Sequence, residues 1–199
     1  MSETTTNAEQ KSLLREKAHQ RRAALSPAFR KEAAIAAAET FAAAVPIKEG
    51  QVVSLYWAIR DELATEPLLV QLMDEGHQVC LPVVLGRDQP LEFRLWQPGQ
   101  PLAPSGFGTL APQLGAPVVT PDIMVLPMLG FDKHGNRLGY GAGHYDRSID
   151  GIDKPVMLVG YAFAAQELDA MPAEPHDKPL DMVVTEAGVK RLRKEEAVS

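Results

Sequence analysis

The segment at residues 130–147, GFDKHGNRLGYGAGHYDR, most limits the folds that this chain can adopt. An apolar run at residues 123–129 comes directly before it, and glycines stand at positions 130, 135, 139, 141 and 143. This order is typical of a buried strand, a glycine-rich loop and the start of a helix. In α/β proteins such a loop binds phosphate groups, because small residues let backbone N–H groups approach an anion. The sequence therefore predicts a phosphate-binding loop in an α/β protein.

The spacing of these glycines matches none of the common nucleotide-binding motifs. Gly139, Gly141 and Gly143 alternate with other residues, whereas the dinucleotide fingerprint places its third glycine three residues after the second. The Gly-Lys-Ser/Thr of the P-loop is also missing after them. A glycine-rich hairpin around residues 132–135 is the structural alternative, since Asp-Lys-His-Gly is a good turn sequence. That alternative explains Gly135 but not the three further glycines that flank Tyr140 and Ala142. We therefore favour a binding role for the loop.

The same segment resembles the signature of the 5-formyltetrahydrofolate cyclo-ligases, also called 5,10-methenyltetrahydrofolate synthetases. The pattern of that family reads approximately GFD-x-x-G-x-RLG-x-G-x-G-Y/F-YD-R. The residues that match it are Gly130, Phe131, Asp132, Gly135, Arg137, Leu138, Gly139, Gly141, Gly143, Tyr145, Asp146 and Arg147. His144 departs from it, since the family usually has Tyr or Phe at that place. A match of this length is specific, and it implies an ATP-dependent ligase of folate one-carbon metabolism.

Length and composition fit one globular domain that spans residues 1–199, since 45% of the residues are hydrophobic. The polar residues 1–10 and the charged residues 190–199 are expected to be flexible. A net charge of −6 argues against a nucleic-acid partner. No apolar run is long enough to span a bilayer, and the polar start lacks the core of a signal peptide. We therefore expect a cytoplasmic protein without a membrane partner.

Helical and strand patterns alternate along the chain, which predicts a three-layer α/β/α, Rossmann-like fold with a mostly parallel twisted sheet. The strands of that sheet are expected at residues 51–58, 79–84, 123–129, 155–163 and 182–185. Helices are expected at residues 11–25, 26–45, 65–76, 143–149 and 166–170. The buried stripe of the second helix is expected to consist of Ile35, Ala38, Ala42 and Val45.

Residues 91–97 alternate apolar and polar side chains, which predicts an edge strand with one face in water. Trp96 lies on the predicted wet face, where it could stack on a flat ligand or pack under the next loop. That loop, at residues 98–121, is rich in proline and glycine. We expect little regular structure in it, and loops of this kind often cover an active site.

The first helix is locally basic although the protein is acidic overall. Lys11 and Arg15 stand one turn apart, and Arg22 extends the same side. Such charges usually form a solvated helix face. The resemblance implies instead that Lys11 and Arg15 reach the phosphates of ATP. The complete ATP-binding set that it implies is Lys11, Arg15, Arg137, Leu138, Gly139, Tyr140, Gly141, Ala142, Gly143, His144 and Tyr145.

A second group of residues follows the first predicted strand, where open α/β sheets place ligands. An Asp-Glu pair in a loop is normally solvated surface. The resemblance implies that Glu62 contacts the folate, plausibly through donor groups of the pterin ring. Trp57 could line the folate pocket or belong to the core, and the residues leave that choice open. Tyr140 and His144 complete the implied substrate-binding set.

The resemblance implies transfer of the ATP γ-phosphoryl group to the formyl oxygen, attack by the N10 amine and loss of phosphate. Arg137 and Tyr145 are the implied catalytic residues, and Arg147 is a further candidate for a phosphate or folate carboxylate. Asp146 and Asp181 carry the hard oxygen ligands that suit Mg²⁺. Asp146 could instead be a first-turn helix charge, and Asp181 a turn residue. The expected partners are ATP and 5-formyltetrahydrofolate, bound by a monomer.

Two other functions remain open at this point. One is a ligase of the same family that acts on another N-formyl compound. The other is a non-catalytic module that binds phosphate or nucleic acid through the basic first helix and the glycine loop. The acidic net charge and the lack of interleaved aromatic and basic residues argue against this module.

Overall fold

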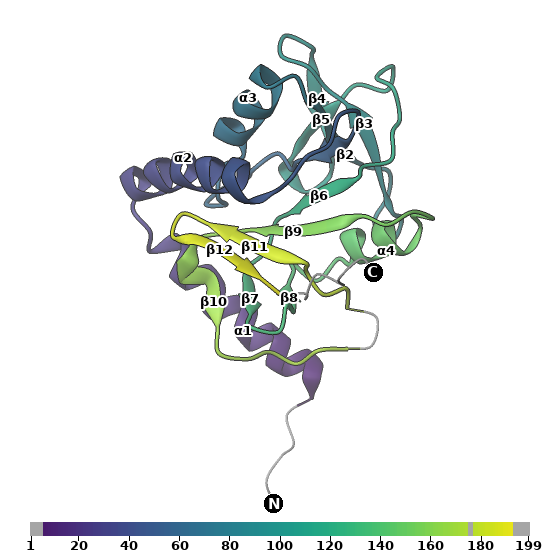
Figure 1. Ribbon diagram of the computed structural model, residues 1–199. Coiled ribbons are helices and arrows are strands. Elements are labelled where there is room, and N and C mark those ends of the chain that lie inside the picture. The colour runs from purple at the N-terminus through teal and green to yellow at the C-terminus, as the bar shows by residue number, and fades with distance from the viewer. Residues whose placement is uncertain (1–5, 175–176, 193–199) are drawn as a thin grey trace, which may run out of the picture.

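The structure is a computed structural model that describes residues 6–174 and 177–192. Its centre is a seven-stranded sheet with the strand order β12-β11-β9-β6-β1-β2-β3 (Figure 1). The strands are β1 (Val52–Ser54), β2 (Gln78–Val84), β3 (Leu91–Leu95), β6 (Ile123–Leu126), β9 (Met157–Tyr161), β11 (Met182–Thr185) and β12 (Gly188–Arg191). The inner pairs are parallel, and β3 and β12 pair antiparallel at the two edges. The prediction of an α/β fold with a mostly parallel sheet is therefore confirmed.

Both faces of the sheet are covered, which is why its inner strands read as continuous apolar runs. Successive side chains of a strand point to opposite faces. Val125 accordingly packs on the side of α2 (Pro27–Ala44) and α3 (Glu66–Asp74), and Met124 packs on the other side. There it meets the layer that contains α4 (His144–Asp150) and the small sheet β10-β7-β8. The bounds of that sheet are β7 (Gly130–Asp132), β8 (Arg137–Leu138) and β10 (Glu167–Leu168).

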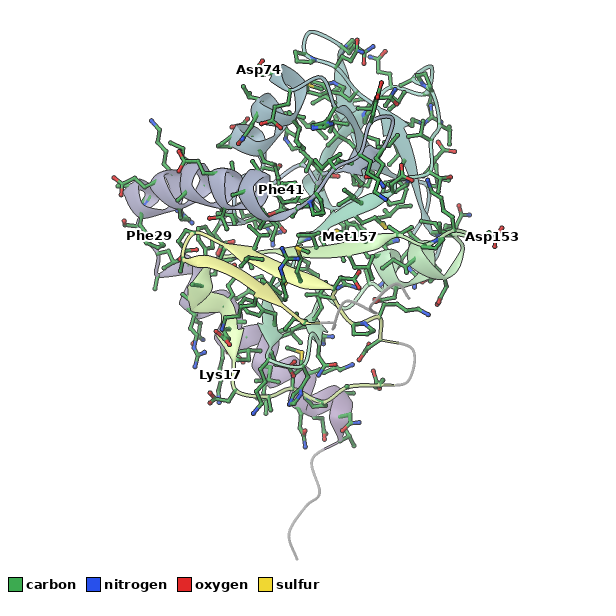
Figure 2. The ribbon with its side chains drawn as sticks, in the orientation of Figure 1. Lys17, Phe29, Phe41, Asp74, Asp153 and Met157 are labelled. Atoms are coloured by element: carbon green, nitrogen blue, oxygen red, sulfur yellow. The ribbon has the colours of Figure 1, made fainter. Side chains whose placement is uncertain are left out.

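Helix α2 begins where its sequence predicts, because Ser26 accepts a hydrogen bond from the backbone N–H of Phe29 at 3.2 Å and proline follows at the first helical position. The predicted buried stripe is right at Ala38 and Val45, which are buried, and wrong at Ile35. Ile35 is 48% exposed, and the helix buries Phe41 together with a row of alanines (Figure 2). The helix is so rich in alanine that the hydrophobic pattern hardly distinguishes one face from another. Packing against the sheet decides instead, and small alanines allow the close approach.

The two ends that are predicted to be flexible both contain regular structure. Helix α1 (Asn7–Ala23) begins within residues 1–10, where Thr6 and Glu9 form a reciprocal capping box. At the other end Lys190 and Arg191 belong to β12, which pairs with β11. Residues 7–10 and 190–191 therefore form regular structure, and their flexibility stays a prediction. Residues 1–5 and 193–199 lie outside the described part of the chain.

The connection at residues 98–121 also contains more structure than predicted. It forms a hairpin of β4 (Leu102–Pro104) and β5 (Leu110–Pro112), with the short 3-10 helix η1 (Gly106–Gly108) at its tip. Residues 113–119, which follow the hairpin, run along β3. Arg94 and Trp96 are buried, so the predicted wet face is wrong. The Nη1 atom of Arg94 donates to the carbonyl of Gln113 at 3.3 Å, and the indole of Trp96 donates to that of Gln100 at 3.1 Å. Trp96 thus packs under the loop.

The predicted helix at residues 166–170 is wrong. The chain makes the 3-10 helix η2 (Ala164–Gln166) and then the strand β10, which pairs with β7. The helical turn ends at Gln166, whose side chain is hydrogen-bonded to two other segments of backbone. It accepts a hydrogen bond from the backbone N–H of Phe163 and donates one to the carbonyl of Met128. None of the described helices is long and apolar enough to cross a membrane.

The glycine-rich segment forms the predicted hairpin, and the loop of the binding interpretation follows it. Strands β7 and β8 form the hairpin, whose turn is held by hydrogen bonds from the backbone of His134 and Asn136 to the carboxylate of Asp132. Gly135 has φ +85° in this turn. The remaining glycines lie beyond the hairpin, in the loop at residues 139–143 that leads into α4. We call residues 139–143 the glycine loop.

Candidate functional site

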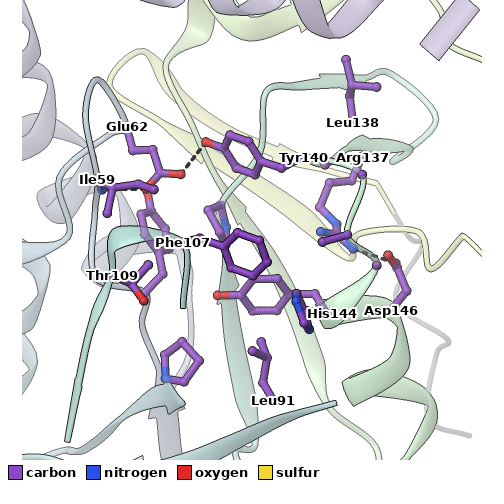
Figure 3. Close-up of a pocket in the computed structure, with 18 of the residues that line it drawn as sticks. Ile59, Glu62, Leu91, Phe107, Thr109, Arg137, Leu138, Tyr140, His144 and Asp146 are labelled. Carbon is purple, nitrogen blue, oxygen red and sulfur yellow. Dashed lines mark hydrogen bonds and ion pairs between the residues drawn. The ribbon is translucent and has the colours of Figure 1, made fainter. Parts of the chain in front are cut away.

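A cavity of about 880 Å³ lies where the parallel strands end, the usual ligand-binding edge of an open α/β sheet. The segments that line it include helix α1, the loop after β1, the tip of the β4–β5 hairpin and the glycine loop with the start of α4. Figure 3 shows side chains from the last three of these segments. The predicted site residues among its walls are Lys11, Arg15, Trp57, Glu62, Arg137, Leu138, Gly139, Tyr140, Gly141, Ala142, Gly143, His144, Tyr145 and Asp146. Residues from distant parts of the chain therefore share one cavity.

The glycine loop has a backbone that side chains would strain. Gly141 has φ +97° and Gly143 has φ +66°, both in the region that favours glycine. Two arginines hold the loop by its carbonyl groups. The Nε atom of Arg15 donates to Gly139 at 3.0 Å, and the Nη2 atom of Arg147 donates to Ala142 at 2.7 Å. Arg147, a candidate for direct ligand contact, thus supports the loop, and the cavity lining does not include it.

Arg137 and Asp146 form an ion pair in the cavity wall, with 2.7 Å between Nη2 and Oδ1 (Figure 3). The hairpin strand β8 carries the arginine and the first turn of α4 carries the aspartate, so the glycine loop brings them together. The guanidinium carbon of Arg137 also lies 5.8 Å from the ring centre of Tyr145, a cation–π distance. The arginine side chain is thereby fixed beside the loop.

Lys11 faces the cavity, unlike the solvated helix face that its segment usually forms. Its ammonium group lies 2.7 Å from the carboxylate of Glu174 and 2.9 Å from that of Asp177. Partial burial lowers the pKa of Lys11, but the hydrogen bonds that it donates to these two carboxylates outweigh burial and raise the pKa overall. Lys11 is therefore a fixed cation at the cavity wall.

Glu62 lies across the cavity, in the loop after β1. One carboxylate oxygen accepts a hydrogen bond from the hydroxyl of Tyr140, and the other accepts from the backbone N–H of Ile59 at 2.9 Å (Figure 3). Burial raises the pKa of Glu62, and these two hydrogen bonds offset only part of the rise. The predicted residue is thus a well-held carboxylate with capacity for further donors, since each oxygen has two lone pairs.

Trp57 lies between the cavity and the core. Its side chain lines the cavity and also packs edge-on against Trp96, with 6.3 Å between the ring centres. Trp57 thus continues the apolar core into the cavity wall beside Glu62.

His144 is buried, with an exposed fraction of 8%. Its Nδ1 atom lies 2.9 Å from the carbonyl oxygen of Gln89, which can only accept, so Nδ1 carries a hydrogen. Its Nε2 atom has no hydrogen-bond partner among the described residues. The ring of Phe107 packs against it edge-on, with 5.3 Å between the ring centres and 65° between the ring planes (Figure 3).

Phe107 was not among the predicted site residues. It lies at the tip of the β4–β5 hairpin, where Gly108, Thr109 and Leu110 also line the cavity. Its φ of +61° and its exposed fraction of 60% are unusual for an aromatic residue. The prediction that the 98–121 connection covers a site points to this tip, although no pattern in the sequence singles out the residue.

The two predicted metal ligands do not lie together. Asp146 lines the cavity, whereas Asp181 precedes β11 at the opposite end of the parallel strands. There its carboxylate accepts a hydrogen bond from the backbone N–H of Leu158 at 2.7 Å. Within residues 6–174 and 177–192, no three His, Cys, Asp or Glu side chains are grouped as a metal site. Mg²⁺ needs only one or two carboxylates beside phosphate oxygens and water, so Asp146 suits it.

Comparison with known proteins gives a consistent result. The profile of the 5-formyltetrahydrofolate cyclo-ligase family matches residues 7–186. The 5-formyltetrahydrofolate cyclo-ligase of Escherichia coli is 33% identical over 176 residues, which cover 85% of this chain and 97% of that protein. The enzyme of the same name from Mycolicibacterium smegmatis is 33% identical over 153 residues, 72% of this chain and 78% of that one.

Solved structures agree. The 5,10-methenyltetrahydrofolate synthetase of Aquifex aeolicus is 29% identical, with a TM-score of 0.81 over 95% of this chain and 96% of that one. The synthetase of Mycoplasma pneumoniae, at 22% identity, shares the fold with a TM-score of 0.72 over 88% of this chain and 98% of that one. The signature at residues 130–147, the match along most of the chain and the shared fold lead to one conclusion. The chain belongs to the 5-formyltetrahydrofolate cyclo-ligase family.

Proposed function

We propose that this protein cyclises 5-formyltetrahydrofolate to 5,10-methenyltetrahydrofolate while ATP is cleaved to ADP and phosphate. Family membership supports the proposal, and the cavity carries it. One side of the cavity combines a glycine loop with the cations Lys11, Arg15 and Arg137, which suits a polyphosphate. The other side combines the carboxylate of Glu62 with an aromatic wall, which suits a flat ring that carries N–H donors.

The chemistry explains why a polyphosphate and a folate would share one cavity. An N-formyl carbon is a poor electrophile, since the amide nitrogen donates into its carbonyl. When the formyl oxygen attacks the γ-phosphorus of ATP, ADP leaves and the formyl carbon becomes iminium-like. The N10 amine then attacks that carbon, loses its proton, and phosphate leaves with the former formyl oxygen. Such a reaction needs positioning and charge neutralisation more than a protein nucleophile.

The residues of the cavity fit these two tasks. Arg137 can neutralise the charge of the transferred phosphoryl group, while its ion pair with Asp146 and its contact with Tyr145 hold it in place. Lys11 and Arg15 would bind the remaining phosphates. A divalent cation, Mg²⁺ with ATP, would be held by Asp146 and would screen the negative charge of the phosphates. We further propose that the protein acts as a monomer in the cytoplasm, without nucleic acid or membrane.

A direct assay tests the proposal. Purified protein is mixed with 5-formyltetrahydrofolate and Mg-ATP, and the near-ultraviolet absorbance of the methenyl product is followed. We expect absorbance to grow only when both ATP and a divalent cation are present. ATP binding without product would point to another N-formyl substrate. The absence of both ATP binding and product would contradict the proposed function.

Removal of the Asp181 carboxylate should affect stability and leave the metal requirement unchanged. Asp181→Ala removes the acceptor of the Leu158 N–H, so we expect the free energy of unfolding to fall by about 1–3 kcal/mol. Asp146→Ala should instead raise the Mg²⁺ concentration that gives half-maximal rate. Thermal unfolding and Mg²⁺ titration of both variants measure the two effects. A folded Asp181→Ala protein that needs several-fold more Mg²⁺ would restore Asp181 as a metal ligand.

Folate binding should weaken at acidic pH through Glu62. The ionised carboxylate accepts hydrogen bonds, and its pKa is raised by burial, so it becomes protonated at higher pH than an ordinary glutamate. The KM for 5-formyltetrahydrofolate should therefore rise as pH falls through that raised pKa. Glu62→Gln should raise this KM by roughly 10- to 100-fold and remove the dependence. Steady-state kinetics across pH, with the KM for ATP as the internal control, check the result. An equal acid dependence in Glu62→Gln would contradict the assignment.

A further inference from the structure

Arg22 is a charged side chain in an unexpected place. It lies on α1 with an exposed fraction of only 2%, whereas Arg21 beside it is exposed. A buried charge is costly unless it is paired and hydrogen-bonded. The guanidinium group of Arg22 has three such contacts. It donates to the carboxylate of Asp61 at 2.7 Å, to the hydroxyl of Tyr140 at 2.7 Å and to the carbonyl of Met128 at 3.3 Å.

These contacts join the two sides of the cavity. Asp61 belongs to the loop after β1, and Tyr140 belongs to the glycine loop, so one guanidinium group bridges two loops from a third element. Burial alone would raise the pKa of Asp61, but the hydrogen bond and charge of Arg22 lower it overall. Both Arg22 and Asp61 are therefore charged at neutral pH, and the ion pair between them is present at that pH.

The hydrogen bonds of Tyr140 determine in which direction its hydroxyl group donates. An arginine can only donate, so the phenolic oxygen accepts from Arg22 and its own hydrogen is left for another acceptor. That acceptor is the carboxylate of Glu62. The guanidinium carbon also lies 5.7 Å from the centre of the Tyr140 ring. Two hydrogen bonds, from Arg22 to Tyr140 and from Tyr140 to Glu62, thus orient the carboxylate that contacts the folate in the proposed function.

We propose that Arg22 is a positioning residue for folate recognition, which acts through the hydroxyl of Tyr140 to fix the orientation of the Glu62 carboxylate. The inference rests on the proposed function, because it assumes that Glu62 contacts the folate. Arg22 itself does not touch the reacting atoms. Its role predicts a selective effect on folate, whereas a merely structural residue would affect stability and both substrates alike.

The charge of Arg22 also bears on the titration of Glu62. The titratable and charged groups that act on this carboxylate or are influenced by it are Arg22, Tyr56, Asp61, Tyr140 and Tyr145. Among them Arg22 is the cation, and it favours the ionised carboxylate. Replacement of Arg22 by a neutral residue should therefore raise the pKa of Glu62 further. The acid limb of kcat/KM for folate should then move to higher pH.

A double-mutant cycle tests the inference. Arg22→Lys keeps the charge but has no planar fork to reach both Tyr140 and Asp61. Tyr140→Phe keeps the ring and removes the hydroxyl. Each variant should raise the KM for 5-formyltetrahydrofolate by roughly tenfold and leave the KM for ATP within about twofold. The double variant should be no worse than Tyr140→Phe alone, since Arg22 acts through that hydroxyl.

Two further variants complete the design. Arg22→Met should shift the acid limb to higher pH, while Arg22→Lys keeps it near that of the wild-type protein. Arg21→Met, one residue away on the exposed face, is the control and should behave as wild type. Thermal unfolding of every variant separates loss of fold from loss of positioning.

The outcomes divide cleanly. Additive effects in the cycle, or an unchanged folate KM in a folded Arg22→Lys protein, would overturn the inference and leave the proposed function intact. A wild-type protein that forms no methenyl product would overturn the proposed function and this inference with it. Non-additive loss of folate affinity with the shifted acid limb in Arg22→Met is the result that we expect.

Discussion

Replacement of Arg137 by alanine should lower kcat by roughly 10²- to 10³-fold, the usual cost of removing a donor that stabilises developing charge. Arg137 stands at the wall of the phosphate side, paired with Asp146 at 2.7 Å and 5.8 Å from the centre of the Tyr145 ring. The charge on the transferred phosphoryl group changes most in the transition state, so kcat should fall more than the KM for either substrate rises. Steady-state kinetics with ATP and folate varied in turn measure both parameters.

A lysine at the same place gives a sharper test of the role. Arg137→Lys retains the positive charge but loses the planar fork, so we expect an intermediate kcat. Arg21→Ala, at an exposed position of α1, serves as the control for loss of an arginine. Thermal unfolding shows whether each variant is folded at the assay temperature. A folded Arg137→Ala protein with a wild-type kcat would remove Arg137 from the catalytic role and leave only the ion pair that holds Asp146.

Local sequence was sufficient wherever a contact is made within one segment. The hairpin turn at Asp132, the start of α2 at Ser26 and the parallel strands all depend on neighbouring residues or on continuous apolar runs. The pairing of Arg137 with Asp146 is also local, because it spans nine residues around the glycine loop. For this reason the hairpin and the loop that leads into α4 could be predicted from a single stretch of the chain.

Contacts between distant segments could not be predicted in this way. The basic pattern of α1 is the same whether Arg22 faces water or Asp61, and the partner lies 39 residues away. Phe107 reaches the cavity because the β4–β5 hairpin packs against β2, where the backbone of Val84 donates to the hydroxyl of Ser105. Residues 113–116 of the same connection bury Arg94, which alternation alone assigns to water. Asp181 is a different case, since its place directly before a parallel strand puts it at the edge of the sheet opposite the cavity.

The second large effect is expected from Gly141→Ala in the glycine loop, because this substitution strains the backbone. Gly141→Ala forces an L residue to adopt φ +97°, which costs about 1–3 kcal/mol. A Cβ atom at this position would meet Arg15 only at an ordinary contact distance of 3.5 Å, so crowding is not the cause. The loop should relax away from its glycine conformation. A displacement of the phosphate groups by about 1 Å can lower the rate by roughly 10²-fold, and we expect a loss of this order in kcat/KM for ATP.

Gly50→Ala is the matched control, because it carries the same kind of strain outside the cavity. Gly50 has φ +80°, no atom lies within 4 Å of a Cβ placed there, and it stands in the turn before β1. Both variants should lose about 1–3 kcal/mol of unfolding free energy. Denaturant unfolding should not distinguish them, whereas kcat/KM for ATP should fall only in Gly141→Ala. An equal kinetic loss in both would mean that strain anywhere in the fold lowers activity. Wild-type ATP kinetics in Gly141→Ala would mean that the loop does not need the left-handed backbone in order to bind phosphate.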